Sequence, residues 1–135
     1  MKFTTLYIAL SLLTFSLFFT SCVEEMEEEN NVVTITIDEP LNEAVITDCT
    51  EVHIHVDVVA TVENHEFEVV LHPEDDTSDR IIDFDLHDHD KELTFDQEVD
   101  LCSYAPGTCF HLEVVACVDH DCEMSEFAEA EFCLE

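Results

Sequence analysis

Basic side chains are almost missing from this sequence. Its 135 residues include only 3 Lys and Arg against 34 Asp and Glu, which gives a formal net charge of −31 with histidine neutral. A protein that binds a nucleic-acid backbone needs clustered Lys and Arg to displace counterions, so DNA and RNA binding are excluded. The same shortage argues against docking on anionic lipid headgroups through protein charge.

Glycine is also scarce, with a single residue in the chain, and tryptophan is absent. Glycine-rich phosphate-binding loops are therefore excluded. Ser78, Ser103 and Ser125 stand outside any nucleophile-elbow pattern, and no carboxylate pair can be singled out as an acid and a base, so we expect no enzyme activity. The 47% hydrophobic content, with 10 Phe, is too high for an acidic disordered chain and predicts a folded acidic domain.

Residues 1–21 have the pattern of a signal peptide. Lys2 is followed by an apolar stretch, residues 6–19, which is too short and too interrupted by Ser and Thr to span a bilayer. The sequence Phe18-Phe19-Thr20-Ser21-Cys22 resembles a bacterial lipobox. That resemblance implies that Cys22 becomes the first mature residue and carries lipid, which anchors the protein to a membrane. An ordinary secretory peptide with cleavage nearby is the alternative.

Residues 22–31 are predicted to form an acidic tether, because five Glu in so short a segment repel one another and do not pack. An acidic run directly after the lipidated cysteine resembles the export signal of Bacteroidota surface lipoproteins. It implies a location at the outer membrane or cell surface, with the periplasmic face as the alternative. Residues 32–135 remain as one domain of ordinary size.

The chain has seven cysteines, an odd number for an exported protein. If Cys22 carries lipid, six remain, and an even number outside the cytosol indicates disulfides. A thiolate metal site is the alternative, although no Cys-x2-Cys pair is present. The six are Cys49, Cys102, Cys109, Cys117, Cys122 and Cys133.

Apolar and polar residues alternate with a period of two through most of the domain, and no stretch has a convincing helical period. Within 50–60, for example, Val52 and Ile54 share one face while His53 and His55 share the other. Seven short strands, each with one apolar face, predict an all-β sandwich. The expected strands are 32–37, 50–60, 65–72, 80–88, 93–101, 109–118 and 124–134.

The segment Tyr104-Ala-Pro-Gly-Thr-Cys-Phe-His-Leu-Glu-Val-Val-Ala-Cys-Val-Asp119 resembles the end of bacterial immunoglobulin-like modules. Together with the His-x-His strand, residues 32–134 resemble uncharacterised Bacteroidota lipoproteins with an immunoglobulin-like domain. The resemblance implies a seven-stranded sandwich in which strand 93–101 pairs with both 50–60 and 80–88, and 109–118 pairs with 124–134. It further implies the disulfides Cys49–Cys102, Cys109–Cys133 and Cys117–Cys122. Pairing of Cys102 with Cys109 and of Cys49 with Cys133 is the alternative.

These strand pairings place histidines beside acids on one outer face. Strands 50–60 and 93–101 bring His53 opposite Glu98, His55 opposite Asp96 and Asp57 opposite Thr94, at Cβ separations of about 5 Å. Pairing of 80–88 with 93–101 adds Asp83, Asp85 and His87 to the same face. Neighbouring carboxylates are expected to raise the pKa of these histidines.

Imidazole together with carboxylate is a ligand set suited to Zn²⁺ and similar divalent ions. We therefore expect His53 and His55, with Asp96 or Glu98, to bind such an ion, with His87 as a further ligand. Two other candidates are the runs His87-Asp88-His89-Asp90 and Asp119-His120-Asp121, whereas His65, His72 and His111 are interpreted as surface residues.

Two other interpretations of the acidic surface stay open. In the first, the chain is a structural or adhesive immunoglobulin-like module without a specific metal site. In the second, its acidity reflects a saline habitat.

Overall fold

A computed structural model describes residues 30–135, so the expected signal peptide, the lipidated Cys22 and most of the tether lie outside the described residues. The described part is built of strands without helices, and it therefore holds no helix that could cross a membrane. Its strands are β1 (Val33–Glu39), β2 (Ala44–Ile46), β3 (Val52–Ala60), β4 (Glu66–Pro73), β5 (Ile82–His87), β6 (Glu92–Val99), β7 (Cys109–Cys117) and β8 (Ser125–Leu134).

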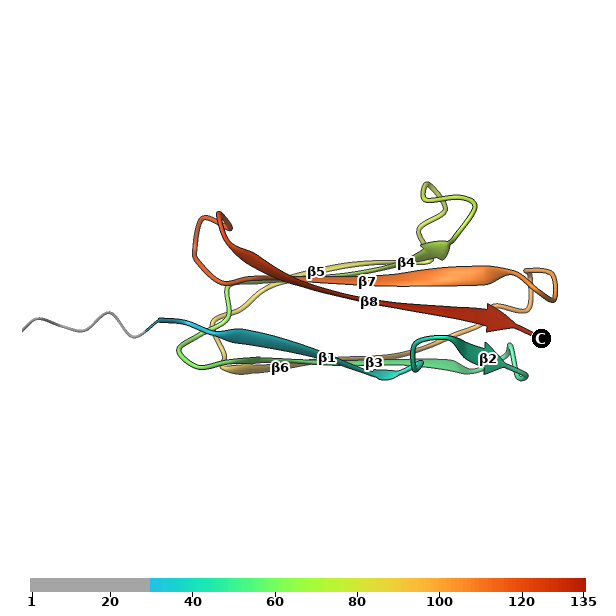
Figure 1. Cartoon of the computed structure of the whole chain (residues 1–135), viewed down its shortest axis with the longest axis horizontal. Coiled ribbons are helices and arrows are strands. Elements are labelled where there is room, and N and C mark those ends of the chain that lie inside the picture. Colours follow the sequence, from blue (N-terminus) through green and yellow to red (C-terminus); the bar gives the residue numbers. More distant parts are fainter. Residues whose placement is uncertain (1–29) are drawn as a thin grey trace, which may run out of the picture.

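Two sheets face each other and form a β-sandwich (Figure 1). The smaller sheet has the order β1-β3-β6 and the larger one the order β2-β8-β7-β4-β5. The pairing of β2 with β8 is parallel, and the other pairings are antiparallel. The predicted β-sandwich is confirmed, but β2 was not predicted because three residues are too few to show a period.

The core forms where the inward faces of the two sheets meet. In β3, Val52, Ile54, Val56 and Val58 are at most 2% exposed, as the alternation predicts. In the opposite sheet, Phe110 of β7 is fully buried and stacks on Phe132 of β8 with ring centroids 5.4 Å apart. Each large apolar side chain buried in this way contributes roughly 1.5–3 kcal/mol.

The expected partner of β5 is wrong. β5 pairs with β4 in the larger sheet, with Phe67 opposite Leu86, and does not join β6. Alternation predicts which side chains face the core, but both sheets bury their inner faces against the same core, so it cannot tell which sheet a strand joins. Phe84 of β5 accordingly meets Phe95 of β6 across the core, with ring centroids 4.9 Å apart.

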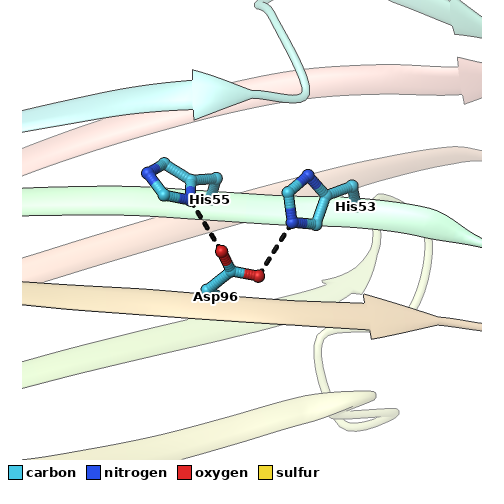
Figure 2. Close-up of side chains that lie close together, drawn as sticks. All are labelled: His53, His55 and Asp96. Atoms are coloured by element: carbon cyan, nitrogen blue, oxygen red, sulfur yellow. Dashed lines mark hydrogen bonds and ion pairs between the residues drawn. The ribbon is translucent and has the colours of Figure 1, made fainter.

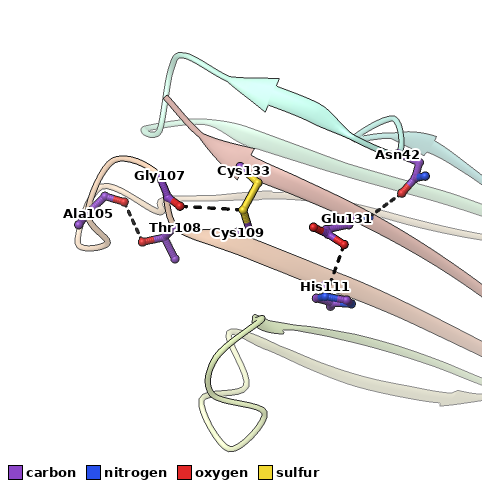
Figure 3. Close-up of a disulfide and its surroundings, with 8 residues drawn as sticks. All are labelled: Asn42, Ala105, Gly107, Thr108, Cys109, His111, Glu131 and Cys133. Carbon is purple, nitrogen blue, oxygen red and sulfur yellow. Dashed lines mark hydrogen bonds and ion pairs between the residues drawn. A yellow bond between two sulfur atoms is a disulfide. The ribbon is translucent and has the colours of Figure 1, made fainter.

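Three disulfides link the six cysteines of the described residues. Cys49–Cys102 joins the segments before β3 and after β6, and Cys109–Cys133 joins β7 to β8 (Figure 3). Cys117–Cys122 closes the connection between β7 and β8. These are the pairs implied by the immunoglobulin-like resemblance, and the alternative pairing of Cys102 with Cys109 does not occur.

Candidate metal centre

The outer face of the smaller sheet carries the candidate centre. Along the β3–β6 pair, His53 lies opposite Glu98, His55 opposite Asp96, and Asp57 opposite Thr94. This is the predicted register. Because inward Val and Ile alternate with these residues in β3, the polar side chains point away from the core.

A single carboxylate joins the two imidazoles (Figure 2). Asp96 Oδ1 lies 2.8 Å from His53 Nε2, and Asp96 Oδ2 lies 3.1 Å from His55 Nδ1. Asp96 reaches both rings because it is directly opposite His55 and diagonal to His53.

The edge strand β1 adds two acids that were not predicted. Glu39 Oε2 lies 2.8 Å from His53 Nδ1, and Asp38 Oδ2 lies 3.9 Å from His55 Nε2. The pairing of β1 with β3 shifts between Ile37 and Glu39, so one extra residue brings both consecutive carboxylates to the histidines. Alternation placed the end of this strand at residue 37, and an irregularity of this kind leaves no periodic signal.

The electrostatics of the group follow from these contacts. Both ring nitrogens of His53 lie 2.8 Å from carboxylate oxygens, and since an ionised carboxylate only accepts hydrogen bonds, this arrangement favours the protonated ring. Hydrogen bonds to Asp96 and then to Glu39 raise the pKa of His53. The hydrogen bond to Asp96, with a smaller contribution from the charge of Asp57, raises the pKa of His55. The two histidines in turn lower the pKa of Asp96.

The ligand atoms of His53, His55 and Asp96 lie within 4.8 Å of one another. A second group, Asp38, His55 and Asp57, overlaps the first through His55. Donors around a tetrahedral Zn²⁺ are about 3.4 Å apart, since each sits about 2.0–2.1 Å from the ion. Small side-chain rotations could therefore gather either group around one cation in exchange for the ring protons.

Two expected ligands do not belong to this group. Glu98 shares the face of His53, but among the described residues its carboxylate makes no hydrogen bond or ion pair with the histidines. His87 lies opposite Glu66 in the other sheet, because β5 pairs with β4. Asp83 and Asp85 lie on β5 with His87 and are therefore also in the other sheet. Asp83 accepts a 2.7 Å hydrogen bond from Arg80.

The interpretation of His65 and His72 as surface residues is wrong, since they are 8% and 5% exposed. His72 stacks on His111 with ring centroids 5.8 Å apart and an interplanar angle of 4°. His111 Nε2 lies 3.8 Å from Glu131 Oε2 in the larger sheet (Figure 3). The eight histidines of the chain thus fall into three groups. One is the pair His53 and His55, the second is the pair His72 and His111, and the third contains His65, His87, His89 and His120.

Neither a protein-family model nor a curated protein matches this sequence.

Proposed function

We propose that this protein is a lipid-anchored, extracytoplasmic binding domain that captures a divalent transition-metal ion on the outer face of its smaller sheet. The observation that carries the proposal is the convergence of His53, His55 and Asp96, whose ligand atoms lie within 4.8 Å of one another. Two imidazoles and one carboxylate suit Zn²⁺, Cu²⁺ or Ni²⁺ better than Ca²⁺ or Mg²⁺, which prefer all-oxygen sites.

The acids around the centre favour a cation there. Asp38, Glu39 and Asp57 crowd the same two histidines and repel one another in the metal-free state. A bound cation relieves that repulsion, and a chain of net charge −31 also concentrates cations near its surface.

The exposure of the centre suits reversible capture. The side chains of His53, His55 and Asp96 are 38%, 26% and 57% exposed, so an ion reaches them without movement of a loop. Three protein ligands also leave at least one coordination position to water or to an exchanging partner ligand.

The proposed fold and location rest on separate observations. The two mostly antiparallel sheets support an immunoglobulin-like sandwich, and the three disulfides support its formation in an oxidising compartment. The lipobox-like sequence ending at Cys22 supports attachment to the outer membrane or cell surface. Labelling cells with an alkyne fatty acid should mark the wild-type protein and leave C22S unmarked, and an unmarked wild type would refute the anchor.

Calorimetric titration of the untagged protein with Zn²⁺ tests the metal proposal. We expect H53A/H55A and D96N to weaken binding, while E98Q binds as the wild type does. Glu98 is a matched control because it lies on the same strand and face as Asp96 but outside the group. Binding should release protons, because the metal replaces protons on the imidazoles. Equal titrations for all four proteins would exclude this centre, and absence of binding by all four would favour a structural or adhesive module.

A further inference from the structure

Four histidines from three different connections meet at the end of the sandwich where residue 30 enters the domain. His65 ends the β3–β4 connection, His87 and His89 lie at and after the end of β5, and His120 lies between β7 and β8. We call His65, His87, His89 and His120 the terminal histidine cluster. It shares no residue with the centre on the smaller sheet.

The rings of the cluster contact one another closely. Ring centroids are 5.0 Å apart for His87 and His89, and 5.4 Å apart for His65 and His89. The ring of His120 lies 5.8, 6.0 and 6.3 Å from the rings of His65, His87 and His89. Two imidazoles on one tetrahedral Zn²⁺, bound at about 2.0–2.1 Å, would have centroids roughly 5 Å apart. The ring spacing is thus close to that of imidazoles on one ion, with the ligand atoms of His65 and His89 already within 4.8 Å of each other, while the rings of His87 and His120 must turn to bring a nitrogen to them.

Hydrogen bonds to backbone carbonyls hold two of these connections together. Asp88 N donates to His65 O at 3.0 Å, and Asn64 Nδ2 donates to Asp90 O at 2.7 Å. These bonds fix the strand end that carries His87 and His89 against the segment that carries His65.

Asn31 and a disulfide fix the third connection, which runs from β7 to β8 and carries His120. Asn31 Nδ2 donates to Glu63 O at 2.7 Å and to Val118 O at 2.9 Å, which links the β3–β4 and β7–β8 connections. The disulfide Cys117–Cys122 closes the short loop that presents His120. The cluster is therefore assembled by the fold, although its members are far apart in sequence.

Buried polar atoms without hydrogen-bond partners lie beside the cluster. Two buried side-chain atoms of the described residues lack a hydrogen-bond partner, namely His65 Nδ1 and Asn64 Oδ1. They belong to consecutive residues, and His65 is the ring that touches both His89 and His120. Buried polar groups are nearly always satisfied, so an unpaired imidazole nitrogen beside the rings of His89 and His120 is a candidate metal ligand.

Glu63 places a carboxylate beside the cluster. Its Oε2 lies 3.5 Å from His89 Nδ1, and one ligand atom each of Glu63, His65 and His89 lie within 4.8 Å of one another. A carboxylate beside one nitrogen of a metal-binding imidazole fixes the ring and leaves the other nitrogen to the ion.

We propose that the terminal histidine cluster is a second metal site, which binds one Zn²⁺, Cu²⁺ or Ni²⁺ ion through imidazole nitrogens. The nitrogen-rich donor set distinguishes it from the mixed site on the smaller sheet and disfavours Ca²⁺ and Mg²⁺. Because the two groups share no ligand, either site can fail without the other.

Copper binding by the H53A/H55A protein isolates the cluster. We expect this variant to bind one Cu²⁺ with an electron paramagnetic resonance spectrum showing three or four nitrogen donors. Adding H89A/H120A should weaken that binding by more than about 100-fold, since even outer-shell changes cost about 10–100-fold. Both of these histidines are exposed, so the metal-free fold should keep its circular dichroism spectrum.

The matched control adds H111A to H53A/H55A, which removes an imidazole outside the cluster. We expect it to keep the nitrogen-rich copper spectrum and the affinity. The proposal is overturned if H53A/H55A binds no Cu²⁺ at micromolar concentration, or if loss of His111 weakens binding as much as loss of His89 and His120. The converse variant H89A/H120A reports the centre on the smaller sheet alone, so failure of either site is recognised separately.

Discussion

At the scale of single residues, Asp96 governs how two imidazoles titrate. Its two oxygens bond His53 and His55 and raise the pKa of both rings. We expect D96N to lower both pKa values toward the unperturbed value of about 6.5, and E98Q to leave them nearly unchanged. Histidine ring signals followed by NMR against pH measure this directly, and equal shifts in the two variants would contradict it.

The same contacts predict opposite pH trends for stability and for metal binding. A raised folded-state pKa stabilises the fold below the unfolded pKa of about 6.5, and this stabilisation is lost as pH rises through the folded pKa. Metal binding needs the neutral ring and strengthens with pH.

Melting temperatures of wild type and D96N between about pH 5.5 and about pH 8.5 test both trends, because these values span the histidine pKa. Without metal, the advantage of the wild type should shrink as pH rises, while the shift caused by Zn²⁺ should grow. A wild-type advantage that is constant across this pH range would show that the ion pairs do not stabilise the fold.

At the scale of strands, alternation was enough to predict the inward faces and the β-sandwich. It placed Val52, Ile54, Val56 and Val58 in the core, and the β3–β6 register followed once the immunoglobulin-like resemblance implied that these strands pair and that Cys49 meets Cys102. It could not assign β5 to a sheet, because strands of either sheet bury their inner face in the same core.

The site was predictable only in part for related reasons. His53, His55 and Asp96 were found because they lie opposite one another on paired strands. Asp38 and Glu39 were missed because an extra residue in β1 brings them to the site. Of the terminal histidine cluster, His87, His89 and His120 were predicted only within two separate runs and His65 was interpreted as a surface residue, because the four come from three connections whose approach depends on long-range contacts.

The disulfides differ in the length of chain they restrain. Cys49–Cys102 spans 53 residues and Cys117–Cys122 spans 5. By loop entropy, C49S/C102S should lose about 4 kcal/mol of unfolding free energy and C117S/C122S about 2 kcal/mol. Urea unfolding measures both, and equal losses would contradict the entropic explanation.

The short disulfide should matter more to metal binding than to stability. Because its loop presents His120, C117S/C122S is expected to weaken copper binding at the terminal histidine cluster, while C49S/C102S leaves it unchanged in the folded protein. The copper spectra of the two variants make the comparison.

At the scale of the whole molecule, negative charge opposes the compact state. With a formal net charge of −31, screening by salt should stabilise the fold without any specific site. We expect about 1 M NaCl to raise the melting temperature of the wild type and of H53A/H55A/H89A/H120A alike, since the Debye length falls to about 3 Å. Micromolar Zn²⁺ at fixed ionic strength should raise that of the wild type only. An equal response of both proteins to Zn²⁺ would assign the effect to charge screening.

Native mass spectrometry of the untagged protein in Zn²⁺ tests the central claim most directly, because it counts the ions on each chain. We predict two Zn²⁺ per wild-type chain, one for H53A/H55A, one for H89A/H120A and none for the fourfold variant. A broad distribution of bound ions that is the same in all four proteins would contradict both metal sites.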